Sequence, residues 1–296
     1  MEFDVLPVRQ YFAFQRLFDG AEWIDISDII RRVRAIKSPY EIERITAAAH
    51  LSDRLAAEIP NLIHEGMSEI ELAGQIEAVA RKLGHQGVVR MRMWGNELFY
   101  GHLMAGASAA VGSYLASPTG GSGIGPAVGQ GPSFRTICRH EPILFDYVFA
   151  LQGYLSDHTR IFSLGELPAE LIQAHEAMQQ IQATIKQVAK PGILAGVLYS
   201  IAVELAKDLG YADHLMGTGD HRIRFIGHGV GTELDEYPFL AKGQPMPLEK
   251  GMVIAVEPKL VFPGKGVVGV ENTHVVMENG LQQLGQFPDD ITVVGN

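Results

Sequence analysis

The sequence is poor in cysteine and in positive charge, and it has no long hydrophobic run. Its 296 residues include one cysteine, Cys138, which excludes an internal disulfide and is typical of a reducing cytoplasm. Lys and Arg total 24 against 34 Asp and Glu, and the net charge of −10 argues against a nucleic-acid partner. No apolar run approaches the ~20 residues of a membrane span, and the start lacks the basic and then apolar pattern of a signal peptide. We therefore expect a soluble cytoplasmic protein without nucleic-acid or membrane partners.

What the chain does contain is two similar runs of helix signals, each followed by a β-rich stretch. Ser38–Glu41 and Ser68–Glu71 are capping boxes, which mark the first turns of two helices. In the second half, apolar residues at helical spacing predict one helix that follows Pro168 and stops before Pro191, and another that stops at Gly210. A helix–helix–sheet plan that occurs twice predicts an α+β fold, built as a pseudo-twofold α/β sandwich.

Four carboxylates lie within apolar, strand-like segments. Asp146 and Asp157 flank an apolar stretch with Gln152 and Gly153 at its centre, which predicts a β-hairpin with one carboxylate on each strand. Glu257 and Glu271 repeat the arrangement on either side of the turn residues 263–266. A carboxylate in a buried strand is costly unless a positive charge compensates it. Cations are therefore expected at these four residues.

His228 supplies a fifth potential metal ligand. Gly227, Gly229 and Gly231 surround it, and we expect them to let the backbone approach a ligand closely. Four carboxylates and one imidazole suit two divalent metal ions, and mostly oxygen donors favour Mn, Co, Zn or Fe. Two such ions would polarise a carbonyl and lower the pKa of a bound water. The predicted chemistry is hydrolysis.

Structural explanations stand beside each functional one. The two aspartates could be surface charges of a hairpin, and His228 could be a packed histidine. The glycine-rich segment 101–131 lacks the pattern of a phosphate-binding loop, so we expect it to form a flexible pocket wall. Strand alternation would turn His158 away from the metals, and Arg160 is expected to brace the hairpin.

At these residues the chain resembles the pita-bread metallopeptidases, the family of methionine aminopeptidase, aminopeptidase P and prolidase, which also contains the metal-free creatinase. The resemblance lies in residues 36–43, 153–160, 227–238 and 248–258. The opening Lys-Ser-Pro-x-Glu-Ile segment and the spacing of the two glutamates are most similar to the aminopeptidase P and prolidase branch.

The resemblance implies a pita-bread (creatinase/aminopeptidase) fold with a curved antiparallel sheet, and a homodimer. By position, it implies that Asp157 and Glu271 bridge two metal ions. Asp146 would complete the coordination of one ion, and His228 and Glu257 would complete that of the other. Glu257 would also take part in catalysis.

Three departures from the family pattern remove donors on the substrate side. Asp235 stands where the family places a histidine that contacts the substrate carbonyl, Gly129 aligns approximately with a second histidine, and Gly269 with an arginine. Donors aimed at a developing oxyanion are commonly worth about 10²–10³ in rate. Asp235 could still serve if it stays protonated, or it could bind a cationic group. His102 could supply part of the lost chemistry, although a structural histidine is the default.

Residues 1–30 are expected to be the remnant of a creatinase-type N-terminal domain, ahead of a catalytic domain at 31–296. The segments 2–8 and 21–26 resemble the last strands of such a domain. Either the chain is a fragment or the protein has shed most of this domain.

Three functions remain open from the sequence. The leading hypothesis is a metal-dependent hydrolase of peptides or peptide-like amides, of the Xaa-Pro aminopeptidase or dipeptidase type. The alternatives are a catalytically weak or inactive protein that uses the pocket for recognition, and a hydrolase of a non-peptide C–N substrate. The presence of all five potential ligands favours the first, and the missing histidines favour the second.

Overall fold

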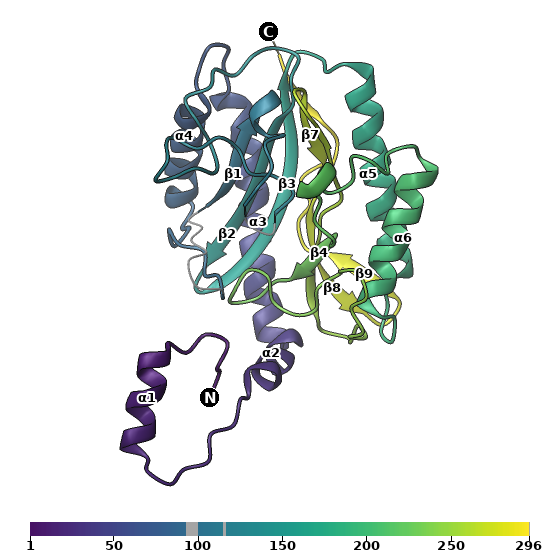
Figure 1. Ribbon diagram of the computed structural model, residues 1–296. Coiled ribbons are helices and arrows are strands. Elements are labelled where there is room, and N and C mark those ends of the chain that lie inside the picture. Colours follow the sequence, from purple (N-terminus) through teal and green to yellow (C-terminus); the bar gives the residue numbers. More distant parts are fainter. Residues whose placement is uncertain (93–99, 115–116, 296) are drawn as a thin grey trace.

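The computed structural model describes residues 1–92, 100–114 and 117–295, and Figure 1 shows two helix pairs flanking a central β-region. The α-helices are α1 Val8–Leu17, α2 Ser27–Ala35, α3 Pro39–Leu62, α4 Glu69–Lys82, α5 Ala169–Val188 and α6 Ala195–Asp208. Two short 3₁₀ helices are η1 Gly106–Ser108 and η2 Gly219–His221. The strands are β1 Gly101–Ala105, β2 Ile143–Leu151, β3 Tyr154–Leu164, β4 Gly227–Gly229, β5 Val253–Val256, β6 Lys259–Phe262, β7 Gly266–Gly269, β8 Asn272–Met277, β9 Gly280–Gln283 and β10 Thr292–Val294.

The helices begin and end close to where the sequence predicts. Ser38 accepts a hydrogen bond from the Glu41 backbone N–H at 3.3 Å, while Glu41 accepts one from the Ser38 N–H at 2.8 Å, so the capping box starts α3. Ser68 and Glu71 do the same for α4. The predicted helices of the second half are α5 and α6. The α+β plan with a helix pair in each half is confirmed.

Each helix pair covers its own sheet. In the first half, α3 and α4 pack on a sheet with strand order β1-β2-β3-β10, around a core that includes Leu55, Ile76 and Phe145. In the second half, α5 and α6 lie outside β4-β5-β8-β9 and the β6-β7 ribbon, around a core that includes Met178 and Ile254. The two halves face each other across the centre of the molecule (Figure 1).

The halves are joined at a seam between β3 and the start of β8. Thr159 and Glu271 exchange backbone hydrogen bonds of 3.3 and 3.4 Å. The Thr273 hydroxyl accepts from the Asp157 N–H at 2.8 Å and donates to the Asp157 carbonyl at 2.9 Å. Two of the predicted metal ligands therefore lie where the two sheets meet.

The expectation of strand character at 2–8 and 21–26 is wrong. Neither segment is a strand, and α1 lies between them. Met1, just before the first segment, donates its N-terminal N–H to the Ile24 carbonyl (2.8 Å) and accepts a hydrogen bond from the Ile26 N–H (3.0 Å). This N-terminal arm projects from the body (Figure 1). A strand without further partner strands is marginally stable in water, which accounts for the difference. The helix α2 crosses residue 30, and the domain division proposed there stays a prediction.

None of the helices in the described ranges combines the length and apolar character that a bilayer crossing requires.

Candidate metal centre

The first two predicted ligands lie on one face of the β2–β3 hairpin. Asp146 pairs with Thr159, and Val148 pairs with Asp157. Opposed residues share a face of a sheet, and so do residues two apart on a strand, so Asp146 and Asp157 point to the same side. Gln152 forms the turn with a φ of 52°. The predicted hairpin with one carboxylate per strand is confirmed.

Glu257 and Glu271 face each other across a break in a second hairpin. Val256 pairs with Asn272 in β5–β8, and the same register continues through β6–β7. The two glutamates occupy the opposed positions between these ladders, just outside the strands in which the sequence placed them. Pro258 offers no N–H to the ladder, which accounts for the break. Both side chains are buried at the seam.

His228 reaches the seam from β4. Its Nδ1 lies 3.1 Å from the carbonyl oxygen of Gly229; an N–H donated there leaves Nε2 as an acceptor. The neighbouring glycines are needed for a reason other than the predicted one. A Cβ on Gly227 would lie 2.2 Å from the Ala255 carbonyl oxygen, and one on Gly229 would lie 2.1 Å from that of Tyr237. They let β4 approach protein backbone rather than a ligand.

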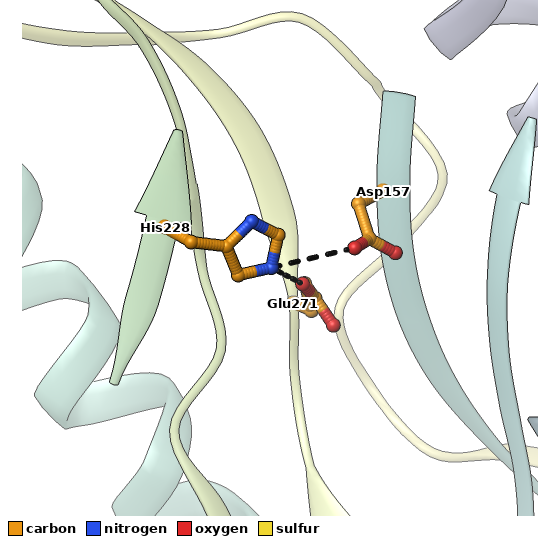
Figure 2. A group of neighbouring side chains, drawn as sticks. All are labelled: Asp157, His228 and Glu271. Carbon is orange, nitrogen blue, oxygen red and sulfur yellow. Dashed lines mark ion pairs between the residues drawn. The ribbon is translucent and has the colours of Figure 1, made fainter. Parts of the chain in front are cut away.

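Asp157, His228 and Glu271 converge on one point (Figure 2). His228 Nε2 is 3.6 Å from Asp157 Oδ2 and 3.9 Å from Glu271 Oε1, beyond hydrogen-bond range. Two donors that bind one ion at about 2.0–2.2 Å each can lie up to about 4.4 Å apart. Among the described residues, Asp157 Oδ1 and Glu271 Oε1 are buried without a hydrogen-bond partner. The spacing and these orphaned oxygens fit one divalent metal ion, with Glu257 Oε1 also 3.6 Å from His228 Nε2.

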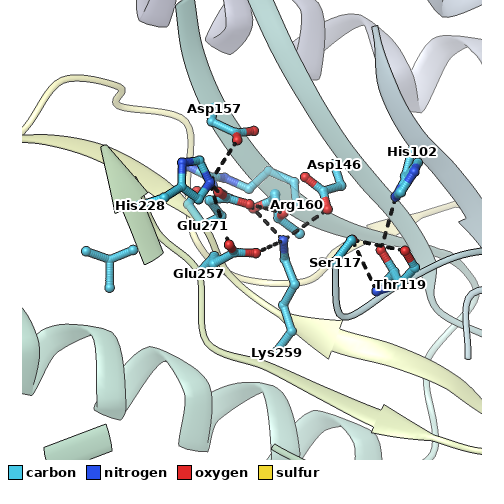
Figure 3. Close-up of polar contacts among 12 residues, drawn as sticks. His102, Ser117, Thr119, Asp146, Asp157, Arg160, His228, Glu257, Lys259 and Glu271 are labelled. Atoms are coloured by element: carbon cyan, nitrogen blue, oxygen red, sulfur yellow. Dashed lines mark hydrogen bonds and ion pairs between the residues drawn. The ribbon is translucent and has the colours of Figure 1, made fainter. Parts of the chain in front are cut away.

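Lys259, which no sequence pattern predicted as a site residue, lies in the same cluster (Figure 3). Its Nζ donates to Asp146 Oδ2 at 3.0 Å, to Glu257 Oε2 at 2.8 Å and to Glu271 Oε2 at 2.8 Å. The side chain is 1% exposed. Lys259 follows Glu257 by two residues in extended chain, so the two side chains point to the same side. A position for a second divalent ion between Asp146 and Glu271 does not fit alongside this ammonium.

Burial and charge together set how these groups titrate. Burial, and then the carboxylates of Glu271 and Asp146, raise the pKa of Asp157 well above its ordinary value. Burial raises the pKa of Glu257 to about 7, against the opposing effect of Lys259. For Lys259, burial favours the neutral form, but the three carboxylates outweigh it and raise its pKa. The three carboxylates favour the charged ammonium, while burial shifts Asp157 and Glu257 toward their protonated forms, which a bound metal ion would oppose.

A pocket opens over this cluster. Its lining combines the cluster with polar and apolar residues that include Met91, His102, Gln130, Val148, Phe225, Leu234 and Asp235. His102 pairs with Asp146 across β1 and β2, and its ring nitrogens contact Thr119 Oγ1 at 3.2 Å and Gln130 Nε2 at 3.0 Å. Burial lowers the pKa of His102, so the imidazole is neutral at pH 7. All three residues predicted to be catalytic, Glu257, Asp235 and His102, therefore border one pocket.

Comparison with known proteins gives the same picture. Residues 43–278 match the model of metallopeptidase family M24. The chain belongs to this family. It is 28% identical over 295 residues to an Xaa-Pro dipeptidase of Lactobacillus helveticus, covering 99% of this chain and 72% of the relative. It is 31% identical over 273 residues to an Xaa-Pro dipeptidase of Pyrococcus furiosus, covering 92% and 69%.

Solved structures of the family superpose closely. The X-Pro aminopeptidase from Thermotoga maritima MSB8 matches with a TM-score of 0.83 and 27% identity, over 99% of this chain and 74% of that one. The prolidase from Pyrococcus furiosus matches with a TM-score of 0.76 and 27% identity, over 95% and 74%. The pita-bread fold expected from the resemblance is confirmed, as is the prediction of an enzyme of the metal-dependent peptidase class.

The three departures from the M24 pattern have different structural settings. Asp235 lies in the pocket wall with a φ of 61°, and its Oδ1 is 3.6 Å from His228 Nδ1. Gly129 has open space, since the nearest atom to an added Cβ is the Gly125 carbonyl oxygen at 4.0 Å. Gly269 is enclosed instead, because a Cβ there would lie 2.5 Å from the Pro258 carbonyl oxygen and 2.7 Å from Lys259 Cα. A Cβ is accommodated at 129, but no side chain fits at 269 without backbone movement.

Arg160 braces the hairpin, as expected, and also ties it to the second sheet across the seam; it does not line the pocket. Its guanidinium donates to the carbonyls of Thr159 and Glu271 and to Asn272 Oδ1, at 2.8 to 2.9 Å. His158 pairs with Tyr147 across the hairpin, which puts it on the face opposite Asp157. Strand alternation predicted this placement of His158.

Glu236 holds the loop that carries Asp235. It accepts backbone N–H donors from Thr232 (3.0 Å) and Glu233 (3.1 Å), and its other oxygen pairs with the buried Lys37 at 3.0 Å. We expect Glu236→Gln to lower the free energy of unfolding by about 1–3 kcal/mol, because Lys37 loses its charged partner while one acceptor remains. Denaturant unfolding measures this. The control Glu278→Gln disrupts an exposed pair with Lys250 and should change stability by under about 1 kcal/mol. Equal effects of the two variants would contradict the role given to Glu236.

Proposed function

We propose that this M24 chain hydrolyses short peptides with proline after the scissile bond, in the pocket at the seam of its two sheets. The observation that supports this most is the convergence of Asp157, His228 and Glu271, with Glu257 beside them, below an open pocket. The names of the relatives, Xaa-Pro dipeptidases and prolidases, support the same substrate class.

Asp157, His228 and Glu271 would hold a divalent ion, which when bound would polarise a carbonyl and lower the pKa of a water, so that hydroxide could attack that carbonyl. Lys259 holds Glu257 through Oε2, so Oε1 is directed to the cluster. A carboxylate held in this position beside the ion is placed to accept a proton from a water bound there. Glu257 is therefore the proposed base that accepts the proton of the attacking water and returns it to the leaving amine.

The pocket supports a substrate with a small apolar ring. Val148, Phe225 and Leu234 offer apolar surface beside the cluster, and Gln130 offers an amide. The donor set of oxygens with one imidazole is consistent with Mn, Co, Zn or Fe. A cytoplasmic homodimer belongs to the same proposal, and the mass of the protein in solution tests the dimer.

Turnover of a dipeptide panel tests the function. Metal-stripped protein is supplied with Mn²⁺ or Co²⁺ and given Xaa-Pro dipeptides beside matched Xaa-Ala dipeptides. We expect metal-dependent cleavage with a preference for the proline series. Protein that binds metal but cleaves no member of either series would contradict the proposal and favour a recognition role for the pocket.

We expect Asp235→His to raise kcat on the best dipeptide by about tenfold. The change replaces a negative charge on the carbonyl side with a neutral donor, and donors that act in the transition state change kcat. The φ of 61° at this position is one that histidine adopts more readily than most residues.

Asp235→Ala is the matched control, because it removes the charge without adding a donor. The double variant with Gly129→His tests whether the second missing histidine limits the gain. If Asp235→His instead abolishes the native activity, Asp235 holds a cationic part of the substrate.

A further inference from the structure

The feature of this centre that its family membership does not explain is Lys259. Its ammonium donates to oxygens of Asp146, Glu257 and Glu271, all at 2.8 to 3.0 Å, in a setting that is 1% exposed. An ammonium with three carboxylate neighbours and no exposure is a fixed part of the structure, since each of its donors has a charged acceptor.

The place of Lys259 in the cluster is specific. The resemblance to the family assigns one metal position to Asp146 together with the bridging Asp157 and Glu271, and the other to His228 and Glu257 with the same bridges. Glu271 divides its oxygens between the two positions: Oε1 faces His228, and Oε2 accepts from Lys259. Lys259 thus stands on the Asp146 side, and the His228 side is left intact.

We propose that the Lys259 ammonium takes the place of one of the two metal ions of this family, so that the chain holds a single divalent ion, at Asp157, His228 and Glu271. This inference rests on the proposed function, since it concerns the same metal site, but it is tested by counting bound ions and not by peptidase activity.

Distance and charge both exclude a second ion while Lys259 is in place. A divalent ion of this class needs the Asp146 and Glu271 oxygens at about 2.0–2.2 Å. Those oxygens already accept hydrogen bonds from Lys259 Nζ at 3.0 and 2.8 Å. An ion bound to the same atoms would lie against the ammonium, and like charges at such separations repel strongly in a buried site.

The strand pairing explains how the lysine is accommodated. Lys259 is directly opposite Gly269, the position where the family pattern has an arginine. A Cβ at 269 would lie 2.7 Å from Lys259 Cα and 3.0 Å from its Cγ. Gly269 and Lys259 are therefore structurally linked. The absence of a side chain at 269 leaves the space that the Lys259 side chain uses to reach the carboxylates. The ammonium supplies a positive charge but no open ligand position.

Metal stoichiometry tests the proposal. Metal-free protein is dialysed against excess Mn²⁺, bound manganese is counted by elemental analysis, and its electron paramagnetic resonance spectrum is recorded. We expect one ion per chain and the six-line spectrum of an isolated Mn²⁺. Lys259→Ala should bind two ions and show the spectrum of a coupled pair. The control Lys265→Ala, on the exposed turn of the same hairpin, should bind one ion as wild type does.

Asp146→Asn keeps the test decisive if Lys259→Ala does not fold. It removes a partner of Lys259 but no ligand of the single ion, so one ion should still bind, with affinity within about threefold of wild type. Two ions in wild type, falling to one in Asp146→Asn, would overturn the single-ion proposal and leave the peptidase function standing. An absence of bound metal in wild type would also overturn the single-ion proposal. Failure to cleave any dipeptide with one ion bound would instead overturn the function alone.

Discussion

Alanine in place of Asp157 is expected to abolish tight metal binding and to lower kcat/KM on Xaa-Pro dipeptides by about a thousandfold or more. Asp157 contributes one of three donors that meet at a single point, and two donors hold a divalent ion poorly. Polarisation by the ion is worth several kcal/mol in the transition state, and each 1.36 kcal/mol is a factor of about ten. Calorimetric titration with Mn²⁺ measures the binding, and turnover of the best dipeptide measures the rate.

Asp146→Ala is the control for Asp157→Ala, because it removes a nearby carboxylate that is not one of the three donors. Asp146 contacts Lys259 rather than the point where the three donors meet, so its loss should weaken metal binding much less than the loss of Asp157 or Glu271. Circular dichroism of each variant controls for folding. Equal losses of affinity in the three variants would show that the ligand roles have been misassigned.

Lys259→Ala is expected to destabilise the metal-free protein by about 3–5 kcal/mol, because it leaves buried carboxylates without their cation. Glu257 and Glu271 lie at 4% and 1% exposure, so water cannot replace the ammonium. Denaturant unfolding in the presence of a chelator measures the loss. Added Mn²⁺ should restore much of it, since ions that bind only the folded state stabilise that state.

Lys265→Ala is the control for this variant. Lys265 forms an ion pair with Glu170 in which both side chains are more than half exposed, and such pairs contribute about 0–1 kcal/mol. A stability change for Lys259→Ala no larger than for Lys265→Ala would mean that the buried ammonium is not needed to hold the cluster together.

The sequence predicted the carboxylate positions because they break a strong local pattern. Asp146 and Asp157 interrupt apolar strands around a turn signal, and the structure confirms the hairpin that they imply. The capping boxes likewise fixed the starts of α3 and α4, since both partners of each box lie within four residues. Signals that are local in the chain were sufficient for these features.

Lys259 carried the same kind of signal and was missed. It precedes the apolar Leu260-Val261-Phe262, so it is a charged residue at the start of a buried strand, and it stands two residues after Glu257. The principle that a buried charge needs a partner applies to it as it does to the glutamates. What the sequence could not give was the register that puts Lys259 opposite Gly269 and beside Asp146, because that depends on contacts between distant strands.

The two interpretations that were wrong also concern contacts between distant segments. Gly227 and Gly229 were interpreted as approaching a ligand, but they approach Ala255 and Tyr237, which no local pattern reveals. Residues 2–8 and 21–26 have strand-like composition, yet they find no sheet to join in the described chain. Strand-like composition permits a segment to form a strand, but whether it does so depends on neighbouring strands with which it can pair.

Anomalous diffraction from a crystal soaked in Mn²⁺ tests the central claim most directly, because it places each ion and each ligand in one measurement. The account predicts one anomalous peak, at about 2.0–2.3 Å from donor atoms of Asp157, His228 and Glu271, with Lys259 Nζ still against Asp146. Two peaks with Lys259 displaced from the cluster, or none at saturating metal while the side chains remain converged, would contradict it.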